Sequence, residues 1–147
     1  MGARTTAREA ALQMLYAVEA SGSSVDQAIK NFWWELPGDA EGREYADAVV
    51  VGVSAELDDL DRRIRAASQN WRLERMTRVD RNVLRIGTWE LLKQHEIPRA
   101  VILDEAVELA KRFGTEESGA FVNGVLDRIA DDCGRVDQDR PLETPEP

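Results

Sequence analysis

The sequence predicts an all-α protein, a compact bundle of six or seven helices. Apolar residues recur every three or four positions through most of the chain, which places them on one side of a helix. No segment shows the alternation of apolar and polar residues that is typical of a strand. Residues that commonly start or end helices separate the periodic segments. We therefore expect helices that bury their apolar sides against one another.

The first predicted helix begins near the N-terminus. Thr6 and, three residues later, Glu9 match a capping box, in which side chains accept hydrogen bonds from free backbone N–H groups at a helix start. The apolar stripe of this helix consists of Ala7, Ala11, Met14, Leu15 and Val18. The sequence Ser21-Gly22-Ser23 is expected to end the helix.

Two further segments complete the first half of the bundle. A short helix is predicted over residues 24–34, and Ser24 with Gln27 forms its capping box. A long helical stretch follows over residues 41–68. We expect this stretch to bend near Gly52 or Ser54.

The second half begins with a connector over residues 70–76, followed by a helix that Thr77 and Asp80 start and that ends near Gln94. Pro98 can occupy the first turn of the next helix, and Gly114 is placed to end it.

The last predicted helix starts at Thr115, which is expected to cap it. It contains Asn123-Gly124 in its middle, because the flanking apolar residues have helical spacing. Glycine within a helix costs about 1 kcal/mol relative to alanine. We therefore expect a neighbouring helix to approach closely at Gly124.

Length and composition predict one folded domain with a short tail. The chain has 147 residues, and we assign residues 1–133 to the helical domain. Residues 134–147 contain three prolines and few apolar residues, which predicts a disordered acidic tail. No apolar run approaches the roughly 18 residues of a membrane-spanning helix, and the N-terminus lacks the apolar stretch of a secretory signal. We expect a cytoplasmic protein that does not enter membranes.

Residues that commonly perform catalysis are scarce. The chain contains one cysteine, Cys133, and one histidine, His95, which excludes an internal disulfide and a cysteine-rich zinc site. His95 is expected at a helix end and Cys133 as a small, half-buried residue. No glycine-rich phosphate-binding loop is present. We predict a protein that is not an enzyme and uses neither cofactor nor metal.

The net charge of −9 is unevenly distributed along the chain. Residues 39–61 contain eight acidic residues and one arginine, whereas residues 62–85 contain eight arginines and two acidic residues. Arg78, Arg81 and Arg85 share one side of their helix. They could contact RNA or form ion pairs within the chain, and we favour ion pairs because the oppositely charged segments are adjacent.

Two other places in the sequence could contact RNA. Arg4 and Arg8 lie four residues apart at the first helix start, where Thr5, Thr6 and free backbone N–H groups could help to hold a phosphate. Simple solvated charges are the alternative, and the residues alone favour it. Phe121 has a core position in its stripe, but it also lies early in its helix and could stack on an unpaired base.

Three stretches of the sequence resemble one protein family. They are AREAALQMLYAVE over residues 7–19, RVDRNVLRIGTWELL over residues 78–92, and IPRAVILDEAVELAKRFGTEESGAFVNGVLDRIA over residues 97–130. These stretches are similar to the NusB transcription antitermination family, whereas residues 21–75 match it weakly. The resemblance implies two packed three-helix subdomains. It also implies binding to the boxA RNA of nascent ribosomal RNA leader transcripts, together with the ribosomal protein NusE, in an RNA polymerase antitermination complex.

The resemblance also assigns roles to individual residues. It places RNA binding on Arg4, Thr5, Thr6, Arg8, Glu117, Phe121 and Asn123. It places the surface for the partner protein on Tyr16, Glu74 and Asp80, and an acidic surface would attract the basic NusE. Many family members have arginine where this chain has Thr5 and Thr6. We expect weaker RNA binding as a result, because fewer counterions are released.

Three other interpretations stay open. One is a protein–protein adaptor of the antitermination complex with little direct RNA binding, which Thr5, Thr6 and the acidic composition favour. Another is a fragment of a ribosomal-RNA cytosine methyltransferase, since some of these enzymes begin with a NusB-like domain. We do not expect such a fragment, because the chain has no methyl-donor domain. The third is a homodimer that uses the surface for the partner protein.

Overall fold

The structure is a computed structural model that describes residues 2–36, 42–69 and 71–135. Within these ranges every regular element is helical, with seven α-helices and one short 3₁₀ turn. They are α1 (Ala3–Ser21), α2 (Val25–Glu35), α3 (Arg43–Ala55), α4 (Leu57–Ser68), the 3₁₀ turn η1 (Leu73–Arg75), α5 (Arg78–Lys93), α6 (Arg99–Phe113) and α7 (Ser118–Asp132). The prediction of an all-α bundle is confirmed.

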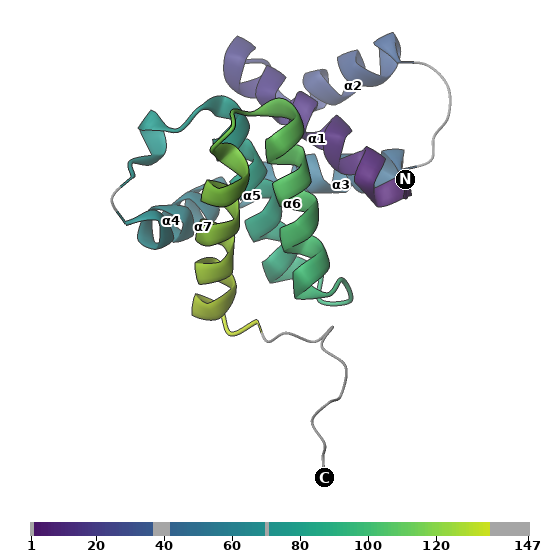
Figure 1. The fold of residues 1–147 in the computed structure, drawn as a ribbon. Helices are drawn as coiled ribbons and strands as arrows, with labels where there is room; N and C mark the ends of the chain where they lie inside the picture. Colours follow the sequence, from purple (N-terminus) through teal and green to yellow (C-terminus); the bar gives the residue numbers. More distant parts are fainter. Residues whose placement is uncertain (1, 37–41, 70, 136–147) are drawn as a thin grey trace.

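Helix α5 is the central element of the bundle (Figure 1). It packs against α1, α3, α4, α6 and α7, and residues 82–91 of α5 are all buried. Helices α1, α2 and α3 contact one another and form an N-terminal group, while α4, α6 and α7 complete a C-terminal group around α5. Helix α5 thus contacts helices of both groups.

The stretch predicted over residues 41–68 consists of two helices in the structure. Helices α3 and α4 are separated by Glu56, which has a φ of −118° and a ψ of 26°. This break lies two residues beyond Ser54 and four beyond Gly52, the two positions at which a bend was expected. The change of direction lets α4 bury Leu60 and Ile64 in the core.

Two of the predicted helix starts are confirmed. The Ser24 hydroxyl accepts a hydrogen bond from the Gln27 N–H at 3.1 Å, and the Thr77 hydroxyl accepts one from the Asp80 N–H at 3.1 Å. Each side chain satisfies a backbone donor that would otherwise lack a partner.

The helix starts predicted from Thr6 and Thr115 are wrong. Helix α1 begins at Ala3, before Thr6, because Gly2 already takes the capping position. Helix α7 begins at Ser118, three residues after Thr115, because residues 115–117 form a turn in which the Thr115 N–H donates to the Ser118 hydroxyl at 2.9 Å.

Two glycines within helices have different surroundings. A Cβ at Gly52 in α3 would overlap the indole of Trp89 in α5, so glycine is required for the close approach of these helices. A Cβ at Gly124 in α7 would meet nothing within 4 Å. Asn123-Gly124 is helical as predicted, but the close approach expected at Gly124 is wrong.

Arg135 follows α7 and is packed against the bundle. Its side chain donates to the backbone carbonyls of Leu91, at 2.8 Å, and of Ile97, while its own carbonyl accepts from Arg99 Nη1 at 2.8 Å. Arg135 is 5% exposed, although the predicted tail began at residue 134. Residues 136–147 of that tail lie outside the described part of the chain.

Candidate nucleic-acid interface

Arg8 is buried in the core of the bundle. Its Nε donates to the two carboxylate oxygens of Glu90 at 3.0 and 2.8 Å, and the Tyr45 hydroxyl donates to the same carboxylate. Arg8 is 2% exposed because α1 packs this side against α3 and α5. The expectation that Arg8 projects from an exposed helix start is wrong.

Burial also controls ionisation in this cluster. It raises the pKa of Glu90, against the opposing effect of the Arg8 charge. It raises the pKa of Tyr45 as well, and the negative charge of Glu90 adds to this effect. Tyr45 therefore keeps its hydroxyl proton at neutral pH and remains a hydrogen-bond donor to Glu90.

Arg4 is the exposed arginine at the start of α1. Its guanidinium carbon lies 5.1 Å from the centre of the Tyr45 ring, and its Nη2 lies 3.4 Å from Oε2 of Glu96. Thr6 is exposed next to it. Of the predicted basic pair, Arg4 is thus the member whose guanidinium can reach a ligand.

Thr5 lines a hollow of about 360 Å³ between α1 and α6. Its walls include three carboxylate side chains, those of Glu9, Glu105 and Glu108, and one guanidinium, that of Arg112. Glu9 is paired with Arg112, and Glu105 lies 3.5 Å from Nη1 of Arg8. The described surroundings of this helix start are thus more acidic than the sequence predicted.

A groove of about 470 Å³ opens between the start of α7 and the connector that precedes α5. Trp71, Asp80, Glu117 and Phe121 are among the residues that line it. Trp71 is 50% exposed, and its ring centre lies 6.5 Å from that of Phe121 at an interplanar angle of 68°. Phe121 is half-buried, so its ring reaches the groove and is not enclosed in the core.

Carboxylate oxygens lie beside these two aromatic rings. Oδ1 of Asp80 is buried and has no hydrogen-bond partner among the described residues. Glu117 is exposed, and its Oε1 lies 3.4 Å from Oγ1 of Thr115. The groove therefore combines flat apolar surfaces with acceptors for N–H groups, a combination that suits an unpaired nucleobase.

Asn123 lies apart from this groove. It is exposed and lines a polar hollow between α6 and α7, together with Arg99 and Asp127. Arg99 Nη2 donates to Asp127 at 2.7 Å. The residues predicted to bind RNA are therefore divided among the start of α1, the groove and this hollow. Figure 1 shows the start of α1 and the connector before α5 at opposite sides of the bundle.

The residues predicted to bind the partner protein are also distributed. Tyr16 is 42% exposed on α1, and the guanidinium carbon of Arg78 lies 5.8 Å from its ring centre. Glu74 is exposed on η1, with Oε2 4.0 Å from Nη2 of Arg65. Asp80 lies in the groove described above, beside Phe121, so it borders both predicted surfaces.

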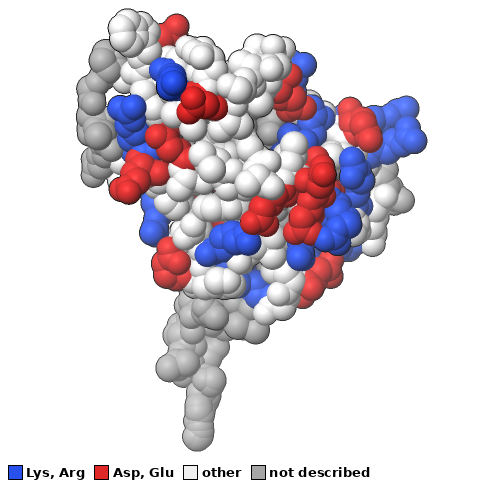
Figure 2. Space-filling view, turned by 180° about the vertical axis from the view of Figure 1, so that it is seen from behind, with Lys and Arg blue, Asp and Glu red and all other residues white. Residues whose placement is uncertain are grey.

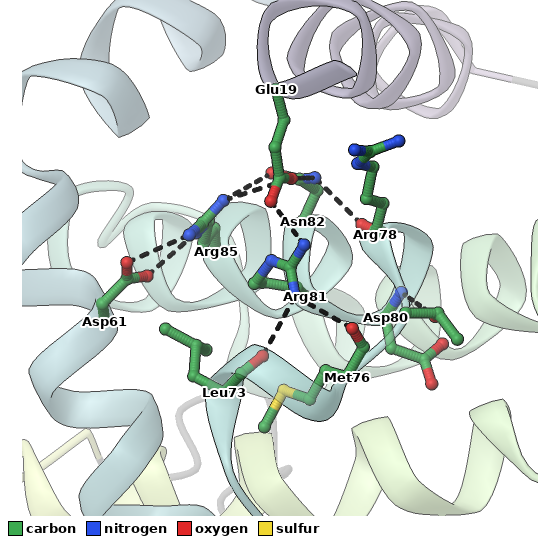
Figure 3. A network of polar contacts seen from close by, with 10 residues as sticks. Glu19, Asp61, Leu73, Met76, Arg78, Asp80, Arg81, Asn82 and Arg85 are labelled. Carbon is green, nitrogen blue, oxygen red and sulfur yellow. Dashed lines mark hydrogen bonds and ion pairs between the residues drawn. The ribbon is translucent and has the colours of Figure 1, made fainter.

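Two of the three arginines in the row on α5, Arg81 and Arg85, form ion pairs within the chain (Figure 3), whereas Arg78 forms none among the described residues. Arg85 contacts both carboxylate oxygens of Asp61 at 2.8 and 3.0 Å, and Arg81 is paired with Glu19. Burial alone would raise the pKa of Glu19, but hydrogen bonds from Asn82 and Arg81 lower it overall. The favoured interpretation of Arg81 and Arg85 is confirmed, with Glu19 of α1 as an unexpected partner.

Positively and negatively charged side chains are mixed on the face of the molecule opposite to the view of Figure 1. Figure 2 shows Lys and Arg next to Asp and Glu on this face rather than one continuous patch of either sign. Such mixing leaves little long-range attraction for a polyanion. Contacts at short range must therefore carry most of any binding to RNA through this face.

Two residues of these sites were not singled out in the sequence. Trp71 was placed only in a connector, and Tyr45 belonged to a stretch that matches the family weakly. A tryptophan in a connector shortly before a predicted helix start was a usable signal for Trp71. No local signal marks Tyr45, because its partner Glu90 is 45 residues away.

Among the described residues, no group of three or more His, Cys, Asp or Glu side chains could hold a metal ion. No helix in the described ranges has the length and apolar character needed to cross a membrane.

Comparison with known proteins gives consistent matches. A family model described as the NusB family matches residues 5–131. The transcription antitermination protein NusB of Sorangium cellulosum (strain So ce56) is 71% identical over 140 residues, which cover 95% of this chain and all of that protein.

Solved structures agree with this result. T. maritima NusB has a TM-score of 0.81 and 40% identity, over 88% of this chain and 91% of that one. A structure of the antitermination factors NusB and NusE in complex with dsRNA contains a chain with a TM-score of 0.81 and 27% identity, over 88% of this chain and 97% of that one. The chain belongs to the NusB family of transcription antitermination proteins.

Proposed function

We propose that this protein binds boxA-type RNA of ribosomal RNA leader transcripts together with NusE. In this role it acts within an RNA polymerase antitermination complex and catalyses no reaction. The name of the Sorangium relative supports antitermination, and the related structure with NusE and dsRNA supports the two kinds of partner.

The groove is the observation that carries RNA binding. The exposed ring of Trp71 and the half-buried ring of Phe121 offer surfaces on which an unpaired base can stack, which contributes about 1–3 kcal/mol per base. Asp80 and Glu117 supply acceptors for the amino groups of bases. Side chains read RNA sequence mainly through such unstacked bases, because the major groove of an RNA duplex is too narrow.

The start of α1 contributes a smaller, electrostatic share. Arg4 can contact a phosphate, whereas Arg8 is occupied by Glu90. Each lost phosphate contact lowers both the affinity and its dependence on salt. Binding by the protein alone is therefore expected to be weak, and NusE would strengthen it by adding its own basic surface.

The test is an anisotropy titration of labelled boxA RNA with the protein, with and without NusE. We expect tighter binding with NusE, and weaker binding of a scrambled RNA in both cases. Replacement of Trp71 by leucine should weaken binding several-fold while leaving the urea midpoint nearly unchanged, since half of this side chain is exposed. Equal affinity for boxA and scrambled RNA would contradict the proposal.

A protein–protein adaptor with little direct RNA contact is the second candidate function. The burial of Arg8 and the acidic hollow beside Thr5 favour it. The same titration separates the two candidate functions. If the protein is an adaptor, it binds NusE normally, and W71L leaves the RNA affinity of the complex with NusE unchanged.

A further inference from the structure

Tyr45 links the buried Arg8 cluster to the exposed Arg4. The Arg4 guanidinium carbon lies 5.1 Å from the centre of its ring, within the range of a cation–π contact. We propose that Tyr45 is a positioning residue that holds the Arg4 guanidinium ready for an RNA phosphate. This inference rests on the proposed RNA-binding function and assigns a role to a residue outside the groove.

The ring of Tyr45 is itself fixed in place. Its hydroxyl donates to Glu90, which is 1% exposed and receives two hydrogen bonds from Nε of Arg8. The cluster joins α1, α3 and α5, because Arg8, Tyr45 and Glu90 come from these three helices. A ring held at one end by a buried carboxylate has little freedom to rotate away from Arg4.

Stacking leaves the hydrogen-bonding edge of Arg4 available. A guanidinium contacts an aromatic ring through its face, whereas its N–H groups point outward in its plane and can bind a phosphate in pairs. The Arg4 side chain is 49% exposed, so a phosphate can approach this edge. Tyr45 and the phosphate would therefore use different parts of the same group.

Preorganisation is the expected benefit. A free arginine side chain loses rotamer freedom when it binds, and a ring that already restricts it reduces that loss. Glu96 is the competing group, because its Oε2 lies 3.4 Å from Nη2 of Arg4 and its charge repels a phosphate. Exposed ion pairs of this kind are weak, so RNA can displace Glu96.

The experiment compares three substitutions in the complex with NusE, using boxA RNA at several salt concentrations. Arg4→Ala should weaken binding by about threefold to tenfold and reduce the slope of log Kd against log salt by about 0.7, the value for one contact with single-stranded RNA. Tyr45→Leu should reproduce most of both changes. Tyr45→Phe should retain more of the wild-type salt slope than Tyr45→Leu, because phenylalanine keeps the ring and loses only the hydroxyl that helps to fix it.

The phenylalanine and leucine variants form a matched pair. Both lose the hydrogen bond to Glu90, so the loss of stability from that bond is shared, and urea unfolding measures the further loss from the smaller leucine side chain. Arg43→Ala is the control for stacked arginines, since the Arg43 guanidinium carbon lies 5.0 Å from the Trp33 ring centre. Arg43→Ala should leave the salt slope unchanged.

The double variant Arg4→Ala/Tyr45→Leu decides the outcome. If Tyr45 acts through Arg4, the double variant binds as Arg4→Ala does. Additive losses, or equal salt slopes for Tyr45→Leu and wild type, would overturn the inference while leaving the proposed function intact. Failure of the wild-type complex to distinguish boxA from scrambled RNA would instead overturn the proposed function and this inference with it.

Discussion

Arg4 and Arg8 show how differently two residues of one helix face can be used. Helical spacing places them on the same side of α1, and this much could be predicted. One is exposed and stacked on Tyr45, whereas the other is buried against a carboxylate 82 residues later in the chain. Local sequence carries no information about a partner so distant, which explains why the burial of Arg8 was not predicted.

The Arg8–Glu90 pair should be a determinant of stability. Arg8→Met leaves a buried carboxylate without its counter-charge and is expected to lower the free energy of unfolding by about 3–5 kcal/mol. Adding Glu90→Gln should recover part of this loss, because the neutral amide can still accept from the Tyr45 hydroxyl. Urea denaturation of the two single variants and the double variant measures the coupling. An Arg8→Met variant with unchanged stability but impaired RNA binding would restore Arg8 as an RNA contact.

Glu19 predicts a dependence of stability on pH. Its pKa is lowered in the folded state from an ordinary value of 4.5, so its stabilising effect is complete above that value and is lost as pH falls through the folded pKa. Glu19→Gln should therefore be less stable than wild type by about 1–2 kcal/mol at pH 7. This difference in stability between the variant and wild type should be smaller below about pH 4.5. Urea titrations at pH 7 and at a pH below 4.5 measure it. A difference that grows on acidification would contradict this assignment.

The starts and ends of elements were only partly predictable. Ser24 and Thr77 cap their helices as expected, since capping needs only residues three positions apart. Thr6 and Thr115 have the same signature but do not cap, because Gly2 and the 115–117 turn set the helix starts earlier and later. A capping motif indicates that a start is nearby, and the competing backbone conformation decides which residue is used.

Two helix-interior glycines give opposite predictions. Gly52→Ala should destabilise the fold by about 1–3 kcal/mol, because its Cβ would overlap Trp89 between α3 and α5. Gly124→Ala should stabilise it by up to about 1 kcal/mol, since the space is open and alanine favours helix. Thermal unfolding of the two variants tests both statements. A loss of stability in Gly124→Ala would mean that α7 is not a regular helix at this position.

At the scale of the whole molecule, the end of the described chain is part of the bundle. Arg135 donates to carbonyls at the end of α5 and in the turn before α6, where helix ends leave acceptors free. Arg135→Ala should cost about 2–3 kcal/mol, because several buried carbonyls lose a charged donor together. Chemical denaturation measures the effect, and Arg128→Ala on the exposed face of α7 is the matched control. Equal stability of the two variants would refute the anchoring role.

The overall class and family were accessible from sequence, whereas the layout of the site was not. Helical periodicity and the C-terminal motifs are properties of short sequence segments. The periodicity identified the helical bundle, and the motifs identified the family resemblance. The groove instead depends on residues 71 and 121 meeting in space, and the division of the predicted RNA residues depends on how α1 crosses the bundle. Tertiary contacts between distant segments decide these features.

The buried middle of α5 has a consequence for local opening. Because residues 82–91 contact both groups of helices, neither group can separate without exposing the interior of α5. Amide protons in this segment should therefore exchange with deuterated solvent only when the entire chain unfolds, and they should share one protection energy. The two halves of the molecule would then behave as a single cooperative unit, with the outlying α2 as the first part to release its amide protons.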